Sequence, residues 1–320
     1  KVVGALEMRL LSLILPIFNE QSCIADFFSQ LGILRRNLSN LGVEVELVFV
    51  DDGSTDQSIL EILTHGSSSN VLVVQLSRNF GKEAALLAGL EHATGDAVVP
   101  YDIDMQDPLM LVEELVRCWI EGARRVIAVR KDRRAESCVK RWTSGLYHRL
   151  LRQMSDSPIE PEVGDFQLMD RKVLDKFLEV RDKVRYTKGL FSWMGYRPRV
   201  VEYDRVRRSG GHSKFSTFNL LTLGLSGLFS LSVKPIKLIA ICGIVVAIFS
   251  FALALYFLVL RIFTGIDVPG YASLAVMISF FSGVQMIFLG VIGMYVGTVL
   301  KESKERPIYV VEEVHRTDFD

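Results

Sequence analysis

The sequence has no excess of charge of either sign and contains little cysteine. Its 320 residues include 37 Lys+Arg and 37 Asp+Glu, so the formal net charge is zero. Proteins that bind nucleic acids usually carry a net basic field, and we therefore expect no nucleic-acid partner. The four cysteines and the five histidines show neither metal-site spacing nor a disulfide framework, which is typical of a cytoplasmic domain.

Two common phosphate-binding loops are also absent. The chain contains neither G-x-G-x-x-G nor G-x-x-x-x-G-K-[ST]. The stretch at residues 210–214, GGHSK, lacks the second spacing and does not follow a predicted strand. These absences disfavour dinucleotide-dependent oxidoreductases and P-loop nucleotide hydrolases.

Charged residues are missing from two long apolar stretches, residues 238–260 and 272–300. A helix needs about 20 apolar residues to cross a hydrocarbon core of about 30 Å, so both stretches are predicted to span a membrane. The alternative is a pair of buried core helices. Basic residues flank the outer ends, so the positive-inside rule places both termini on the cytoplasmic side of the membrane. Residues 216–234 are predicted to form an amphipathic helix in the membrane interface, and residues 235–320 to hold the two spans and a cytoplasmic tail.

Short apolar runs alternate with helical periodicity before these stretches. The predicted strands are residues 10–15, 43–50, 71–76, 97–101 and 125–129, and the predicted helices are residues 22–38, 56–63, 82–93 and 109–121. This alternation predicts an α/β domain over residues 1–215, with a mainly parallel sheet covered by helices on both faces. Ligands of such sheets bind beyond the C-terminal ends of the strands.

Polar motifs follow three of these strands at the point where each ends. They are Pro16, Asn19 and Glu20 after the first strand, Asp51 and Asp52 after the second, and Asp102, Asp104 and Gln106 after the fourth. Neighbouring carboxylates repel each other, and a hard divalent cation with oxygen ligands offsets that cost. The sequence therefore predicts a site for Mg²⁺ or Mn²⁺ and a diphosphate. For residues 51–56 alone, a turn in which Ser54 or Thr55 caps the next helix is an equally good interpretation.

The motifs LPIFNE, VDDGSTD, SRNFGKEAAL, YDIDMQDP, GDFQLMDR and RSGGHSKF occur in this order between residues 10 and 215. Together they resemble the family-2 glycosyltransferases with a GT-A fold, which has a Rossmann-like sheet. Within that family the chain is similar to the polyisoprenyl-phosphate glycosyltransferases, such as dolichol-phosphate mannose synthases and bacterial bactoprenol glucosyltransferases. The two predicted spans match the membrane-anchored bacterial subgroup.

The resemblance implies a role for each motif. It implies that Asp165 lies by the sugar C1, as a base or as a carboxylate that orients the acceptor. Arg208, Gly211, Ser213 and Lys214 match an R-x-x-G-x-S-K pattern on a loop that closes over phosphates, with Arg208 and Lys214 counted as catalytic. The implied nucleotide-sugar residues are Pro16, Asn19, Glu20, Asp51, Asp52, Lys82 and Asp102, and the implied metal ligands are Asp102, Asp104 and Gln106.

The reaction implied is the inverting transfer of one sugar from a nucleoside diphosphate to a polyprenyl phosphate. An anionic acceptor beside an anionic donor needs cations, and arginine suits phosphate because its planar fork binds two oxygens. The residues expected at the acceptor phosphate are Arg130, Lys140, Arg141, Ser144, Arg205 and Ser213. UDP-glucose is the donor expected from the two-span architecture, with GDP-mannose, UDP-N-acetylglucosamine and 4-amino-arabinose donors as alternatives. A non-catalytic scaffold or lipid-flipping protein is the other alternative, and association of the chain as a homo-oligomer is expected.

Overall fold

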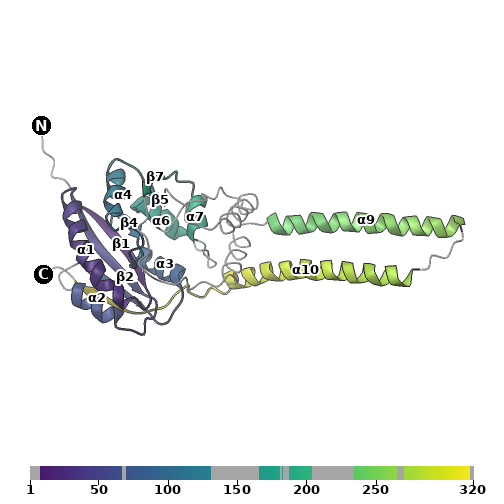
Figure 1. Ribbon diagram of the computed structural model, residues 1–320, viewed down its shortest axis with the longest axis horizontal. Coiled ribbons are helices and arrows are strands. Elements are labelled where there is room, and N and C mark those ends of the chain that lie inside the picture. Colours follow the sequence, from purple (N-terminus) through teal and green to yellow (C-terminus); the bar gives the residue numbers. More distant parts are fainter. Residues whose placement is uncertain are drawn as a thin grey trace. The chain divides into compact units, whose positions relative to one another are not determined.

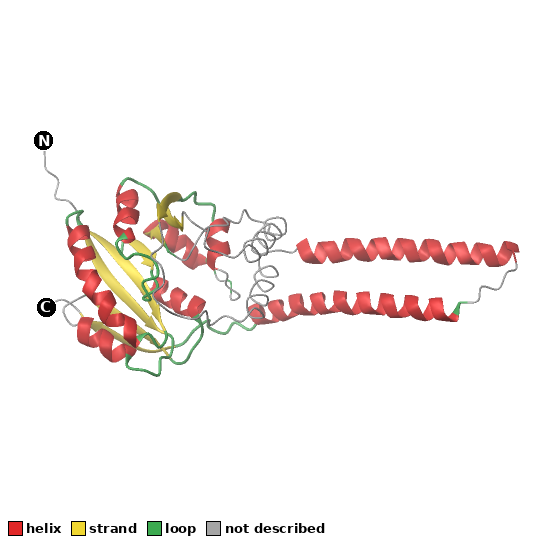
Figure 2. Cartoon of the chain, in the orientation of Figure 1, coloured by secondary structure: helices red, strands yellow, loops and turns green. Residues whose placement is uncertain are grey.

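The computed structural model describes residues 8–66, 70–130, 166–180, 182, 187–203, 234–264 and 270–317. The chain divides into two compact units. Within the described residues, the first unit holds a sheet with its covering helices and also the C-terminal residues from Arg306 onward. The second unit holds two long helices. Figure 1 labels the elements, and Figure 2 shows the helices and strands by colour.

The first nine elements follow the alternation predicted from the sequence. They are β1 (Arg9–Ile17), α1 (Gln21–Ser39), β2 (Val43–Asp51), α2 (Ser58–Gly66), β3 (Val71–Leu76), α3 (Lys82–His92), β4 (Ala97–Pro100), α4 (Leu111–Ile120) and β5 (Arg125–Arg130). Each lies within a few residues of its predicted position. The prediction of strands and helices in this half of the chain is therefore confirmed.

The sheet is mixed, with the strand order β7-β5-β6-β4-β1-β2-β3-β8. Strands β4, β1, β2 and β3 pair in parallel, as predicted. Strand β5 runs in the same direction as these four strands but does not pair with any of them. The strand β6 (Gln167–Asp170) lies between β4 and β5 and runs antiparallel to both, while β7 (Arg199–Tyr203) pairs in parallel with β5. Four residues are too few to reveal a strand by periodicity, and so the sequence did not predict β6.

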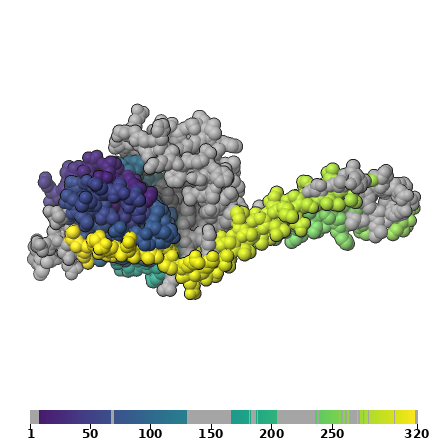
Figure 3. Space-filling view, turned by 90° about the horizontal axis from the view of Figure 1, so that it is seen from below, coloured from purple at the N-terminus to yellow at the C-terminus, as the bar shows by residue number. Residues whose placement is uncertain are grey.

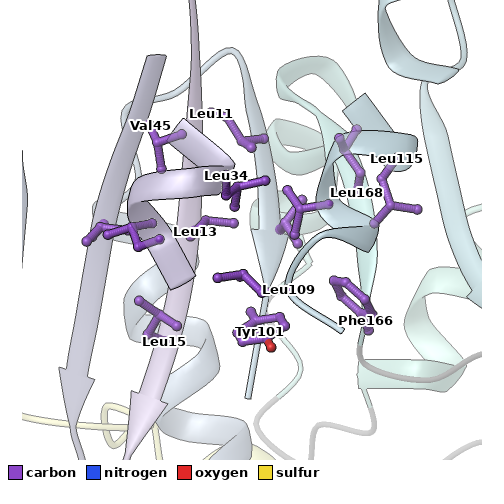
Figure 4. Packing of buried hydrophobic residues seen from close by; sticks show 14 of the residues in the cluster. Leu11, Leu13, Leu15, Leu34, Val45, Tyr101, Leu109, Leu115, Phe166 and Leu168 are labelled. Atoms are coloured by element: carbon purple, nitrogen blue, oxygen red, sulfur yellow. The ribbon is translucent and has the colours of Figure 1, made fainter. Parts of the chain in front are cut away.

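Two apolar layers fill the faces of the sheet. On one face, Leu11, Leu13 and Leu15 of β1 pack with side chains of α1, α2 and α4. Figure 4 shows part of this layer, in which Leu34 of α1 lies over the strand residues. On the other face, β1 residue Ile14 packs with α3, α6 (Arg171–Glu179) and α7 (Thr187–Trp193). Successive side chains of β1 therefore point to opposite buried layers, as in a central parallel strand.

The C-terminal segment is a strand of this sheet, although the sequence predicted a tail. Strand β8 (Val311–Thr317) pairs antiparallel with β3, from Val71 opposite Thr317 to Leu76 opposite Val311. Figure 3 shows this segment, in yellow, on the surface beside the blue part of the same unit. The last residues of the chain thus cover an edge that β3 would otherwise expose.

The second unit contains α9 (Lys234–Thr264) and α10 (Tyr271–Ser303). Among the described residues, one helix is long and apolar enough to cross a membrane, at Val276–Leu300 of α10 with a mean hydropathy of 2.0. The apolar stretch found in α9, Ile239–Leu253, is shorter. The second predicted span therefore stays a prediction. The predicted interfacial helix at residues 216–234 lies almost entirely outside the described residues.

Candidate active site

The polar motifs meet at one edge of the sheet. Because β1, β2, β3 and β4 are parallel, the loops that follow them leave from the same edge. The chain order reverses at β1, which has β2 on one side and β4 on the other. Open α/β sheets bind ligands at such a reversal, because the two following loops diverge there. The loop after β1 and the acidic loop after β4 therefore border the expected binding crevice.

The loops after β1 and β2 are joined by Asn19. Its backbone has a positive φ of 55°, a conformation that asparagine tolerates better than most residues. Its backbone N–H donates to Ser54 Oγ at 2.9 Å, and its side-chain oxygen accepts from the Thr55 N–H at 2.8 Å. One interpretation of the sequence predicted that Ser54 or Thr55 caps the next helix, α2. Neither residue does so. Asp56 takes that place, because its Oδ1 accepts from the Ser58 N–H at the helix start.

Asp51 and Asp52 are buried, with exposed fractions of 0% and 4%. The Asp51 carboxylate accepts from the Ser54 N–H at 3.1 Å, which shapes the turn after β2. The Asp52 carboxylate accepts from the N–H groups of Phe80 and Gly81 at 2.7 and 2.9 Å. Burial raises the pKa of both carboxyl groups, and these hydrogen bonds lower it again in part. Both side chains thus fix the loops of the site, and their contact with a nucleoside stays a prediction.

The acidic loop after β4 presents carboxylates outward. Asp102 and Asp104 are exposed, whereas Ile103 between them is buried. That the two carboxylates face one ligand stays a prediction. The backbone N–H of Gln106 donates to Asp104 Oδ1 at 3.2 Å, and its side-chain amide donates to Asp104 Oδ2. Burial, followed by the nearby carboxylates, raises the pKa of Tyr101 at the start of this loop.

Lys82 brings a cation to the acidic loop from the start of α3. Its Nζ lies 2.8 Å from both carboxylate oxygens of Asp102. Both side chains are 49% exposed, so the pair is solvated and contributes at most about 1 kcal/mol to stability. A cation and a carboxylate that are paired so weakly remain available to a charged ligand. The structure therefore brings Lys82 to the predicted metal and diphosphate residues.

The donor set suits a metal that is shared with a ligand. Asp102, Asp104 and Gln106 offer two carboxylates and one amide oxygen, which are hard ligands of the kind that Mg²⁺ and Mn²⁺ prefer. Among the residues that the structure describes, no group of three or more His, Cys, Asp and Glu side chains could hold a metal ion. Mg²⁺ is commonly bound by one or two carboxylates together with substrate phosphates. The residues fit such a shared ion better than a site made of protein alone.

Several predicted site residues lie outside the described part of the chain. They are Asp165, Arg208, Lys214, Lys140, Arg141, Ser144, Arg205, Gly211 and Ser213. Arg130 ends β5, but its side chain is not described either. Phe166, the neighbour of Asp165, stacks edge-on against Tyr101 at 5.5 Å between ring centroids. Because Tyr101 directly precedes Asp102, the chain at Phe166 lies beside the acidic loop.

Three residues at the site were missed by the sequence analysis. Tyr203 and Asp107 share a hydrogen bond of 2.5 Å across 96 positions of the chain. Gly53 has a positive φ of 77°, and a Cβ there would lie 2.8 Å from backbone atoms of Arg78 and Asn79. The Asp-Gly pair signals a turn, which predicts the positive φ but not the approach of the β3–α3 loop. No local pattern predicts a contact between Tyr203 and Asp107.

The family model described as Glycosyl transferase family 2 matches residues 12–178, which begin within β1 and extend through the acidic loop and β6. The chain belongs to this family and is a glycosyltransferase, which confirms the resemblance noted in the motifs. The most similar relatives match along nearly their whole length. The SfII prophage-derived bactoprenol glucosyl transferase of Shigella flexneri is 41% identical, over 96% of this chain and 98% of that one. The prophage bactoprenol glucosyl transferase homolog of Escherichia coli is 40% identical, over 96% and 99%.

Solved structures resemble the chain more distantly. The mannosyltransferase PcManGT from Pyrobaculum calidifontis, in complex with GDP-Man and Mn²⁺, has 16% identity and a TM-score of 0.42, over 93% of this chain and 88% of that one. A glucosyl-3-phosphoglycerate synthase from Mycobacterium tuberculosis, with Mn²⁺, UDP and glucosyl-3-phosphoglycerate, has 22% identity and a TM-score of 0.41, over 71% and 80%. Likenesses at this level decide nothing about the substrate.

Proposed function

We propose that this glycosyltransferase transfers one glucose from UDP-glucose to a polyprenyl phosphate at the cytoplasmic face of a membrane. The observation that carries the proposal is the likeness to the bactoprenol glucosyl transferase of Shigella phage SfII, at 41% identity over 96% of this chain and 98% of that one. A match of this length includes the sheet, the acidic loop and the long helices. The other donors named above remain alternatives for the same site.

The acidic loop and Lys82 would receive the donor diphosphate. Asp102, Asp104 and Gln106 would hold Mg²⁺ or Mn²⁺, which when bound neutralises charge on the leaving diphosphate. Lys82 already lies 2.8 Å from the Asp102 carboxylate oxygens. In the presence of a diphosphate its ammonium group would instead balance phosphate charge. Asn19, with Ser54 and Thr55, would form the wall of the nucleoside site.

The acceptor would attack the sugar C1 from the face opposite the diphosphate and invert its configuration. A phosphate monoester has a second pKa of about 6, so it is largely dianionic at neutral pH and needs little help from a base. Asp165 would therefore orient the acceptor more than deprotonate it. The basic residues Arg205, Arg208 and Lys214 would offset the repulsion between the acceptor and donor phosphates.

The pairing of β8 with β3 supports a membrane hairpin. Residues 311–317 belong to the same sheet as β1 to β7 and so lie on the same side of any membrane. The chain between β7 and β8 must then cross a membrane an even number of times. If α10 spans, at least one further crossing lies between Tyr203 and Val311, and α9 is the other long helix described there. This topology favours two spans over one.

A transfer assay tests the proposal. The protein in detergent is incubated with Mg²⁺ or Mn²⁺, undecaprenyl phosphate and one radiolabelled donor, either UDP-glucose, GDP-mannose or UDP-N-acetylglucosamine. We expect label to enter the organic phase with UDP-glucose. Asp104→Asn should lower metal-dependent turnover at least about a hundredfold, because it removes a charged ligand at the leaving group. The control Asp175→Asn, on the exposed side of α6, should leave turnover unchanged.

Each result has a definite meaning. Transfer of label from another donor would show that the sugar is not glucose, and it would still support the proposed class of reaction. Full metal-dependent turnover by Asp104→Asn would refute the role of the acidic loop. Binding of UDP without transfer from any of the three donors would contradict the glucosyl transfer and leave two alternatives, an untested sugar or a non-catalytic protein.

A further inference from the structure

The acidic loop is anchored at its far end by two tyrosine hydroxyl groups. Tyr101 Oη donates to the backbone oxygen of Asp107 at 2.7 Å. Tyr203 Oη donates to Asp107 Oδ1 at 2.5 Å. The loop from Asp102 to Gln106 is thus held between β4, which it follows, and the end of β7.

The bond from Tyr203 reaches the loop from a remote strand. In the sheet, β5 and β6 separate β7 from β4, so no backbone pairing between β7 and β4 could hold the loop. The Tyr203 side chain is nevertheless turned inward and is 8% exposed. A bond from a buried phenol to a carboxylate is charge-assisted and fixes its partner more firmly than a bond at the surface does.

Tyr203 also lies close in the sequence to the basic segment of the proposed site. It is the last residue of β7, and Arg205 follows two residues later, at the start of the segment expected to bind phosphates. The hydrogen bond from Tyr203 to Asp107 thus joins the last described residue before this segment to the acidic loop.

We propose that Tyr203 is a positioning residue, whose hydroxyl group holds Asp107 and thereby keeps Asp102 and Asp104 in the arrangement that binds the metal and the diphosphate. The inference rests on the proposed function of the acidic loop. A purely structural tyrosine would stabilise the sheet and leave the affinity of the loop for a metal unchanged. This difference makes the proposal testable without turnover.

The test uses Tyr203→Phe in the full-length protein and measures Mn²⁺ binding in the presence of UDP by electron paramagnetic resonance of the free ion. We expect about tenfold weaker Mn²⁺ binding, and a similar rise in the Mn²⁺ concentration needed for half-maximal turnover. At saturating Mn²⁺, kcat should change less than about threefold, because the proposed role of the hydroxyl group is to hold Asp107 and not to contact the substrate. Tyr309→Phe is the matched control, since its hydroxyl group bonds Glu91, which is not a predicted site residue.

A second variant separates positioning from charge. Asp107→Asn keeps an oxygen that accepts from Tyr203, so its Mn²⁺ affinity should stay within about threefold of the wild type. Unchanged Mn²⁺ affinity in Tyr203→Phe, with a lowered melting temperature, would show a structural role and overturn the proposal. Tenfold weaker binding in Tyr309→Phe as well would also overturn it. A wild type that binds UDP but no Mn²⁺ would refute the metal role in the proposed function and this inference together.

Discussion

Glu46 provides a stringent test of how the sheet is held together, because its carboxylate is fully buried at the edge opposite the site. Its exposed fraction is 0%. It accepts from Ser12 Oγ at 2.5 Å, from Thr94 Oγ1 at 2.7 Å and from the Thr94 N–H at 3.0 Å. Arg316 of β8 places Nη2 3.7 Å from Oε1. One carboxylate thus connects β1, β2, the turn before β4 and the C-terminal strand.

The substitution Glu46→Gln keeps the shape of this side chain and removes its charge. The glutamine amide offers one acceptor oxygen in place of two. Its NH₂ group therefore faces a hydrogen-bond donor, and that donor loses its acceptor. A hydrogen bond to a charged group contributes about 1.5–3 kcal/mol, and an unsatisfied buried donor costs about 1–3 kcal/mol. Removing the charge also removes its desolvation cost, which offsets part of this loss. We therefore expect the free energy of unfolding to fall by about 3 kcal/mol.

Thermal unfolding of the detergent-solubilised protein, followed by tryptophan fluorescence, measures this effect. A domain of this size loses about 2–4 °C of melting temperature per kcal/mol, so Glu46→Gln should melt about 6–12 °C lower. The control Glu44→Gln lies two residues earlier on the same strand and is exposed, so it should change stability by less than about 0.5 kcal/mol. If Glu46→Gln melts together with Glu44→Gln, the buried hydrogen bonds do not contribute and the reasoning fails.

Two further predictions concern the loops of the site. Gly53→Ala should weaken UDP binding at least about tenfold in a calorimetric titration, because its Cβ would lie 2.8 Å from the backbone of Arg78 and Asn79 and displace the loop before Lys82. Gly42→Ala is its control, with a φ of 71° but no atom within 4 Å of the added Cβ, so equal UDP affinity in the two variants would contradict this argument. Asp52→Asn should weaken UDP binding about fivefold, because an amide oxygen can replace one carboxylate acceptor for the Phe80 and Gly81 N–H groups but not both. The control is Asp26→Asn, an exposed substitution on α1. If Asp52→Asn and Asp26→Asn bind UDP with equal affinity, the loop does not depend on Asp52.

The elements that the sequence predicted well are those whose signal is local. The strands β1 to β5 are short apolar runs between turn residues, and buried residues recur at helical spacing in α1, α2 and α4. The parallel pairing of β1 to β4 follows from crossover connections, so the meeting of the polar loops at one edge was also predictable. The acidic loop follows β4, as the sequence predicted, and its role as a metal site stays a prediction.

The elements that the sequence did not predict depend on distant parts of the chain. Strand β6 has four residues and pairs antiparallel on both sides, so neither its length nor its neighbours reveal it. Strand β8 has the sequence VEEVHRT and is largely exposed, and it is a strand because β3 offers an unpaired edge. The bond between Tyr203 and Asp107 spans 96 positions. Such contacts are set by tertiary packing, which a local pattern does not encode.

Burial divides the carboxylates of the site into two kinds that the sequence alone could not separate. Asp51 and Asp52 are adjacent and buried, and their oxygens already accept backbone N–H groups of the surrounding loops. Asp102 and Asp104 are exposed, and their partners are flexible side chains and one N–H group at the surface. Displacing a buried bond leaves a costly unsatisfied group, whereas displacing a solvated one costs little. The buried pair is therefore suited to shaping the site, and the exposed pair is suited to exchanging its partners for a metal and a diphosphate.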